Sequence, residues 1–267
     1  MPPTLVVIGL AAGALAAGVL LTFFLLGWKR TNYRFPQYVM YRFVRYLVCW
    51  QWRTELPERL TFDVSRGAVI VCNHRSSIDP FFIQAMLDRR ALWMVAREYV
   101  ENPAFGWFLR LCDVIPTNRN GIDIASTRSA IRQAKAGNLV GMLPEGRINT
   151  TDELLLPGRP GPVVVALRAR VPIIPCYIFD PPYAGTVWSP FFRRARARVV
   201  VGNPIDLSEY HENGGKNGVA GELTLRVLKE IAALAGHPEF EPQIAPRIWK
   251  HALPTQATRT PEAIRGS

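Results

Sequence analysis

Hydrophobic and polar positions alternate along this chain in a way that is typical of an α/β protein. Short apolar runs rich in β-branched residues predict strands, and longer segments with one apolar face predict helices. The expected strands lie at 68–72, 92–96, 114–117, 139–143, 172–178 and 197–202. The expected helices lie at 80–90, 104–111, 122–136, 160–170 and 219–235. Strands that alternate with helices predict a largely parallel sheet flanked by helices.

The first apolar segment is different, because Thr4 to Trp28 contains no charged residue. As a helix it would be roughly 37 Å long, which exceeds a hydrocarbon core of about 30 Å. A secretory signal peptide is the alternative, but its basic residues normally precede the apolar run. Here Lys29 and Arg30 follow it. The pattern therefore favours a retained anchor in the inner or cell membrane, with the rest of the chain on the cytoplasmic side.

The next segment, Phe35 to Trp52, interleaves aromatic residues with arginines. Such a mixture suits the headgroup layer and predicts an interfacial amphipathic helix. An ordinary surface helix that packs its aromatic stripe on the domain is the alternative, and the two are compatible. Together these segments predict a membrane anchor with an amphipathic helix over 1–55, a catalytic domain over 56–236 and a Pro-rich, extended or partly disordered tail over 237–267.

The composition limits the classes of molecule that this protein is expected to bind. With 32 Lys and Arg against 21 Asp and Glu, the 267 residues carry a formal charge of +11, so an anionic partner is expected. An acidic membrane surface or a phosphorylated substrate fits. Nucleic acid is not expected, because the basic residues form no known reading motif. The four cysteines show neither C-x-x-C nor zinc spacing, which predicts reduced core residues and no metal site.

The first candidate catalytic residues lie just after the strand at 68–72, in the segment Asn73 to Pro80. Asp79 is expected at the N-cap of the following helix, with Pro80 at its first position. His74 and Asp79 thus lie beyond the carboxyl end of a strand, where open α/β sheets bind ligands. A neutral imidazole can act as a general base, and a carboxylate on its other nitrogen would orient it. The alternative is that Asp79 only caps the helix and the other side chains satisfy the turn.

A second group of polar residues follows the strand at 139–143, in Pro144-Glu145-Gly146-Arg147. Gly146 permits a close backbone approach, Arg147 can bind a phosphate, and Glu145 can hold that arginine or a substrate hydroxyl. A simple structural turn is the alternative. Arg119 follows the short strand at 114–117 and is expected to point into the same crevice.

Taken together, these segments resemble the glycerolipid acyltransferases of the 1-acylglycerol-3-phosphate O-acyltransferase type. Four blocks match in order and spacing over about residues 65 to 180. They are Asn73-His74 with Asp79, Arg97 to Arg119, Pro144 to Arg147, and Val171-Pro172-Ile173-Ile174-Pro175. The third block lacks the family's usual Thr, and this shorter form is similar to that of lysophospholipid acyltransferase domains fused to acyl-acid ligases. The second block has Arg97 where Lys is usual.

The resemblance implies direct acyl transfer without a cofactor, with acyl-CoA or acyl-carrier protein as co-substrate. His74, oriented by Asp79, would take the proton from the free hydroxyl of a lysophospholipid, most simply 1-acylglycerol 3-phosphate. Arg119, Arg147, Gly146 and Glu145 would hold the acceptor phosphate, and Asn73 would hold the turn or contribute hydrogen bonds. Ser76 and Ser77 lack a nucleophile-elbow setting and are interpreted as turn residues. The rival interpretations are another acceptor, such as lysophosphatidylethanolamine, and a non-catalytic membrane lipid-binding protein.

Overall fold

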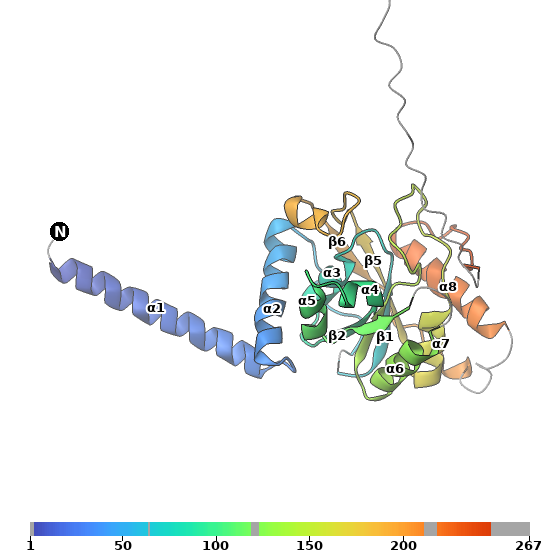
Figure 1. Ribbon diagram of the computed structural model, residues 1–267, viewed down its shortest axis with the longest axis horizontal. Helices are drawn as coiled ribbons and strands as arrows, with labels where there is room; N and C mark the ends of the chain where they lie inside the picture. Colours follow the sequence, from blue (N-terminus) through green and yellow to red (C-terminus); the bar gives the residue numbers. More distant parts are fainter. Residues whose placement is uncertain (1–2, 64, 119–122, 211–217, 247–267) are drawn as a thin grey trace, which may run out of the picture.

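The computed structural model describes residues 3–63, 65–118, 123–210 and 218–246. A central sheet lies between two layers of helices, and a long N-terminal helix extends away from them (Figure 1). The strands are β1 Ala68–Cys72, β2 Ala91–Ala96, β3 Ile115–Thr117, β4 Leu139–Met142, β5 Ile173–Phe179 and β6 Arg198–Val201. The α-helices are α1 Pro3–Lys29, α2 Phe35–Tyr46, α3 Asp79–Ala85, α4 Arg97–Val100, α5 Gly106–Leu111, α6 Ile124–Lys135, α7 Gly161–Ala169 and α8 Val219–Leu234. Three short helices complete the chain: η1 Leu47–Gln51, η2 Ser189–Phe192 and η3 Ser208–Tyr210.

The strand order is β3-β2-β4-β1-β5-β6. All neighbours pair in parallel except β5 and β6, which are antiparallel. The α/β class with a largely parallel, helix-flanked sheet is thereby confirmed. The sequence pattern did not reveal the direction of β6, because a short apolar strand reads the same in either orientation.

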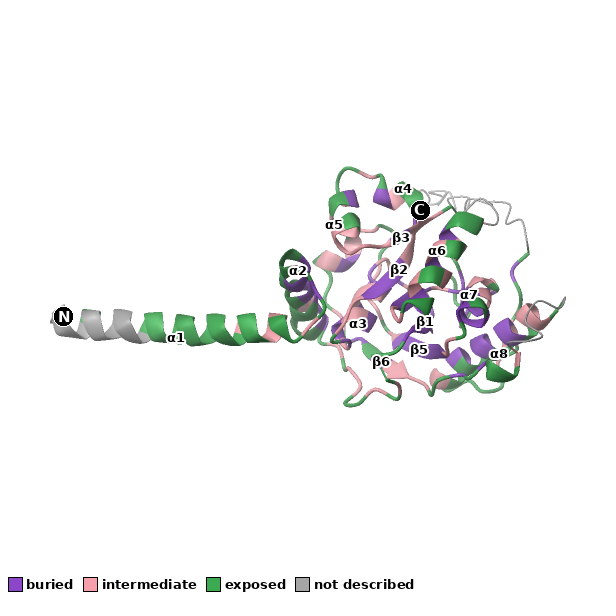
Figure 2. Cartoon of the chain, turned by 90° about the horizontal axis from the view of Figure 1, so that it is seen from below, coloured by how far each residue is buried: buried purple, intermediate pink, exposed green. Residues whose placement is uncertain are grey.

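Strand β1 lies in the middle of the molecule, and its side chains contribute to two separate hydrophobic cores. Val69 and Val71 point to a core shared with α6, α7 and α8. Ala68, Ile70 and Cys72 point to the opposite core, which is shared with α2, η1 and α3. Since successive strand residues face opposite sides, a strand buried on both faces is continuously apolar. Figure 2 shows the central strands of the sheet coloured as buried.

Helix α3 is shorter than the sequence pattern predicted. It begins with Asp79 as its first residue, preceded by Ile78 at the N-cap, and it ends at Ala85 instead of residue 90. The Gln84 side chain closes the helix, because its Nε2 donates to the Arg89 carbonyl oxygen and its Oε1 accepts from the Ala91 N–H, both at 3.0 Å. The chain can therefore turn directly into β2.

The N-terminal region forms the two helices that the sequence predicts. Every residue of α1 from Gly13 to Phe23 is exposed, and this helix lies apart from the domain (Figures 1 and 2). Within the described parts of the chain, no helix combines the length and the apolar character needed to cross a membrane. The membrane anchor therefore stays a prediction, as does the division at residues 55 and 236.

Helix α2 has both buried and exposed apolar side chains, and its predicted interfacial role stays a prediction. Tyr38, Tyr41 and Val44 are buried against the rest of the protein. Phe35 and Phe43 on the same helix are exposed. Val44 thus packs in a core of the domain, whereas Tyr38 and Tyr41 form a separate cluster with Tyr33 and with Phe24 and Trp28 of α1.

Two other expectations need correction. Of the four free cysteines, Cys49 is exposed and only Cys72 and Cys176 are fully buried. The beginning of the C-terminal tail is ordered, since the Gly158 N–H donates to the Gln243 carbonyl oxygen and the Ala245 N–H donates to that of Gly158. Residues 247–267 lie outside the described part of the chain.

Candidate active site

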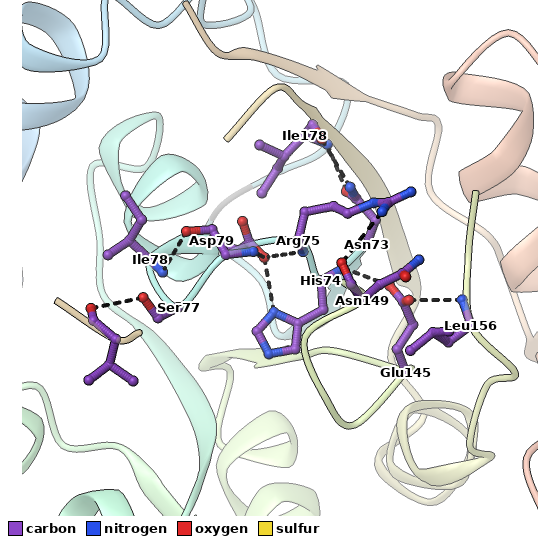
Figure 3. Close-up of polar contacts among 12 residues, drawn as sticks. Asn73, His74, Arg75, Ser77, Ile78, Asp79, Glu145, Asn149, Leu156 and Ile178 are labelled. Atoms are coloured by element: carbon purple, nitrogen blue, oxygen red, sulfur yellow. Dashed lines mark hydrogen bonds and ion pairs between the residues drawn. The ribbon is translucent and has the colours of Figure 1, made fainter. Parts of the chain in front are cut away.

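His74 and Asp79 form a hydrogen-bonded pair at the carboxyl end of β1 (Figure 3). His74 Nδ1 lies 2.9 Å from Asp79 Oδ2. The imidazole keeps 12% of its surface exposed, whereas the Asp79 side chain is fully buried. Because the carboxylate engages Nδ1, Nε2 is the nitrogen left for a substrate. This is the arrangement of an oriented general base.

Asp79 is held by the turn that it follows. Its Oδ2 also accepts hydrogen bonds from the backbone N–H groups of Arg75 and Ser76, each at 2.8 Å. Burial raises the pKa of the Asp79 carboxyl above its usual range, while the hydrogen bonds from His74 and the two backbone groups act in the opposite direction. The carboxylate therefore both shapes the turn and fixes the imidazole, so the simple helix-cap interpretation is insufficient.

Ser76 and Ser77 serve as turn residues, in agreement with the sequence interpretation. The Ser76 hydroxyl donates to the Pro182 carbonyl oxygen at 2.6 Å, and the Ser77 hydroxyl donates to that of Val187 at 3.0 Å. Each hydroxyl thus attaches the turn to the segment that follows β5.

Asn73 has a structural role instead of a substrate contact. It is buried, its Nδ2 donates to the Ile178 carbonyl oxygen at 2.9 Å, and its Oδ1 accepts from the Ile178 N–H at 2.8 Å. Both amide atoms thereby continue the pairing between β1 and β5 beyond the end of β1 (Figure 3). The expectation that it holds the turn is the one that the contacts support.

Glu145 makes two backbone contacts that the sequence did not predict, and its predicted role as a ligand of substrate or of Arg147 stays a prediction. Its Oε1 accepts a hydrogen bond from the His74 backbone N–H at 2.6 Å, and its Oε2 accepts from the Leu156 N–H at 2.9 Å (Figure 3). Burial raises the pKa of this carboxyl to about 7, against the lowering effect of the two backbone donors. Glu145 therefore fixes the position of the His74 main chain.

Gly146 and Arg147 complete the third block. Gly146 has φ +69°, a conformation that favours glycine, and it lines the same cavity as His74. Arg147 is half-buried, and it is not among the described residues that line this cavity. Arg119 lies outside the described residues, so its predicted place at the site stays a prediction.

The cavity has a volume of about 520 Å³ and extends from His74 to the inner face of α2. Its wall is mainly apolar and aromatic. Contributing residues include Tyr41 and Val44 of α2, Phe81 of α3, Trp93 of β2, and Trp107 and Phe108 of α5. Large apolar cavities with few polar groups are typical of sites for lipid-like ligands. The imidazole is thus accessible to a ligand and not sealed in the core.

Two features of this wall were missed by sequence reasoning. Trp93 packs flat on Gly141, where an added Cβ would lie 2.4 Å from the indole ring. Arg159 follows Gly158 in the segment before α7 and also lines the cavity. Neither lies in a polar cluster at the end of a strand, so the pattern that revealed His74 gave no signal. In the described portion of the chain, no group of three or more His, Cys, Asp or Glu side chains is arranged to hold a metal.

Residues 52–179, which contain His74, Asp79 and the third block, match the acyltransferase family. The 1-acyl-sn-glycerol-3-phosphate acyltransferase of Bacillus subtilis is 24% identical over 62% of this chain and 81% of its own length. That of Streptococcus pneumoniae is 26% identical over 53% of this chain, and the human beta enzyme is 30% identical over 46%. The chain spans only about half the length of these two relatives, 51% and 45% respectively.

The fold has a relative of known structure. The crystal structure of the 1-acyl-sn-glycerophosphate (LPA) acyltransferase, PlsC, from Thermotoga maritima superposes with a TM-score of 0.60. The match covers 75% of this chain and 80% of that chain at 18% sequence identity. The site and these matches define an O-acyltransferase. Within that class, residues 52–179 form an acyltransferase domain, and the chain is similar to enzymes named 1-acyl-sn-glycerol-3-phosphate acyltransferase.

Proposed function

We propose that this protein transfers a fatty acyl group from acyl-CoA or acyl-carrier protein to the free hydroxyl of 1-acylglycerol 3-phosphate, giving phosphatidic acid. The supporting observation is the His74–Asp79 pair, whose buried carboxylate binds Nδ1 at 2.9 Å while the imidazole lines an apolar cavity. The acceptor is suggested by the names of the bacterial and human relatives. The same chemistry on lysophosphatidylethanolamine is the alternative.

In the proposed reaction, His74 Nε2 removes the proton from the acceptor hydroxyl as its oxygen attacks the thioester carbonyl carbon. A carbon–oxygen bond forms, and the carbon–sulfur bond then breaks. The thiolate leaves and takes the proton back from the imidazolium, so the base is regenerated. Asp79 stabilises the imidazolium during this exchange. Because a thioester is already activated, a base and correct positioning supply much of the acceleration.

The apolar cavity is the proposed site of the acyl chains. It begins at His74 and reaches α2, so an acyl chain that lies along it would bring its carbonyl carbon to the base. The wall does not distinguish acyl-CoA from acyl-carrier protein as donor, since both deliver the same acyl thioester.

The proposed location is the cytoplasmic side of a membrane, with the N-terminal helices in contact with lipid. The exposed apolar residues of α1 and the outward Phe35 and Phe43 of α2 favour this arrangement. Lys29 and Arg30 at the end of α1 would meet acidic headgroups. Lysophospholipid could then enter the cavity laterally, because one wall of the cavity is formed by α2.

The decisive experiment incubates purified protein with labelled acyl-CoA or acyl-carrier protein and a panel of lysophospholipids, followed by identification of the products. Labelled phosphatidic acid is the expected product, and its loss in His74→Ala is the control for catalysis. Phosphatidylethanolamine as the sole product would assign the other acceptor. Lipid binding without any product would support the non-catalytic interpretation.

A further inference from the structure

One cation in the cavity wall has an unsatisfied donor. Arg159 lines the cavity that contains His74, and its Nε is buried without a hydrogen-bond partner. Arg159 as a residue is only half-buried, but a buried N–H donor without an acceptor costs free energy. Its Nε can therefore gain from an acceptor that the described protein residues do not provide.

The backbone around Arg159 is fixed by four contacts. The Arg159 N–H donates to the Pro144 carbonyl oxygen at 2.9 Å, and the Leu156 N–H donates to Glu145. Gly158, the preceding residue, pairs with the segment 243–245. The Pro144–Glu145 turn, which also supports His74, thus carries the segment that presents Arg159. Such pre-organisation lowers the cost of binding a ligand.

The Arg159 side chain passes directly over Gly146. A Cβ added at Gly146 would lie 3.2 Å from Arg159 Nε, 3.4 Å from its Cδ and 3.7 Å from its Cζ. Because Gly146 has no side chain, the Arg159 guanidinium can lie at this position. The glycine of the third block would act through a residue that lies outside the block.

The electrostatic surroundings favour an anion at this point. Among the described residues of the cavity wall there is no Asp or Glu, and the other guanidinium, that of Arg90, is engaged by Asp113 and Gln37. Burial and the nearby Arg159 charge lower the pKa of Arg147. Two guanidinium groups thus approach each other near Gly146, and a phosphate between or beside them would relieve their repulsion.

We propose that Arg159 binds the phosphate of the acceptor lipid and thereby positions the acceptor's free hydroxyl at His74 Nε2. In 1-acylglycerol 3-phosphate, the free hydroxyl and the phosphate are on adjacent carbon atoms. The phosphate site must therefore lie close to the base, and Arg159 lines the same cavity and contacts Gly146, whose neighbour Glu145 accepts from the His74 N–H. The phosphates of CoA are separated from the thioester by the whole pantetheine arm, so they are the less suitable anion for this position.

The test compares Arg159→Gln and Arg159→Lys with Arg168→Gln, which removes the same charge from an exposed position on α7. Initial rates are measured with the acceptor varied at saturating acyl-CoA, and then with acyl-CoA varied. For Arg159→Gln we expect the KM for 1-acylglycerol 3-phosphate to rise roughly 10- to 100-fold. Arg159→Lys should recover part of the loss, and Arg168→Gln should match the wild type.

A second acceptor separates phosphate binding from a structural effect. With 1-acylglycerol, which has no phosphate, wild type and Arg159→Gln should react at equal rates. An equal loss with both acceptors, an unchanged acceptor KM, or a rise confined to the KM for acyl-CoA would each overturn the assignment.

Because this assignment rests on the proposed function, binding is also measured without turnover. Calorimetry with 1-acylglycerol 3-phosphate compares His74→Ala with the double variant His74→Ala, Arg159→Gln. Weaker binding by the double variant supports the Arg159 site even if the wild type transfers no acyl group, in which case only the proposed function fails. Equal binding by the two variants overturns the Arg159 site and leaves the proposed function in place.

Discussion

Glu145 holds the main chain of His74 through a 2.6 Å hydrogen bond from the His74 N–H to Glu145 Oε1. The second carboxylate oxygen accepts the Leu156 N–H at 2.9 Å. The third block therefore connects to His74 through the Glu145 carboxylate, which accepts a hydrogen bond from the His74 main chain.

Substitution of Glu145 by Gln should destabilise the protein. The amide has one oxygen and one nitrogen, so one of the two buried backbone N–H groups would lose its acceptor and face another donor. We expect a loss of about 1–3 kcal/mol in the free energy of unfolding, measured by urea denaturation at pH 5, below most of the range in which ionisation of Glu145 lowers the stability of the wild type. Glu230→Gln, at an exposed position on α8, is the control. Equal stability of the two variants would contradict this role of Glu145.

The ionisation of Glu145 should also make stability depend on pH. Burial raises the pKa of this carboxyl in the folded protein from an ordinary 4.5 to about 7. Between these values the unfolded chain releases the proton more readily than the folded one, so rising pH favours unfolding. The stability difference between wild type and Glu145→Gln should fall from about pH 4.5 to about pH 7 and then level off. Urea titrations at pH 5, 6, 7 and 8 measure this difference, and a difference that grows with pH would refute the assignment.

Asp79→Asn should reduce turnover more than folding. The amide oxygen can occupy the position of Oδ2 and keep the backbone donors of Arg75 and Ser76, but the negative charge that stabilises the imidazolium is lost. We expect kcat to fall on the order of 10³-fold, with little change in the acceptor KM. Steady-state kinetics and circular dichroism check the two parts. A variant with near-normal kcat would show that the carboxylate charge is dispensable.

Asn73→Ala should loosen the connection between β1 and β5. The substitution leaves the Ile178 N–H and carbonyl oxygen without their buried partners, at a cost of about 2–4 kcal/mol for the two groups. Thermal denaturation measures the loss. Asn138→Ala, at the turn after α6, is a control outside the site. If Asn73→Ala instead altered only the acceptor KM, Asn73 would be a substrate ligand after all.

Gly141→Ala should change the preference for acyl chain length. The added methyl would lie 2.4 Å from the Trp93 ring, so the indole must move, and Trp93 lines the cavity. We expect lower kcat/KM for long acyl donors than for short ones, measured over a series of saturated acyl-CoA substrates. Combining Gly141→Ala with Trp93→Leu should restore kcat/KM for the long acyl donors. A uniform loss at every chain length would indicate general damage to the sheet.

The sequence alone was sufficient to predict those strands and helices whose residues show a clear hydrophobic pattern. The continuous apolar run at 68–72 coincides with β1. The helix expected at 122–136 corresponds to α6, and Gly137, with φ +84°, follows its end. Helix α3 was predicted too long, because the side chain that ends it, Gln84, acts through contacts with Arg89 and Ala91 that no periodicity reveals.

The site was predictable only where chemistry follows directly from residue type. His74 and Asp79 are close in the sequence and meet in the structure. Asn73 and Glu145 were expected to bind substrate, because polar residues after buried strands have no packing role there. Their partners, Ile178 and the His74 main chain, are distant along the chain, so only the assembled sheet reveals them. Arg159 required the fold for the same reason.

The position of β1 has a consequence for how this enzyme loses activity. The side chains of β1 belong alternately to one hydrophobic core and to the other. Neither core can therefore unfold while the other keeps its native packing. His74 is the second residue after the end of this strand. Heat inactivation and the disappearance of near-ultraviolet circular dichroism should accordingly share one midpoint, with no partially folded species that still turns over substrate.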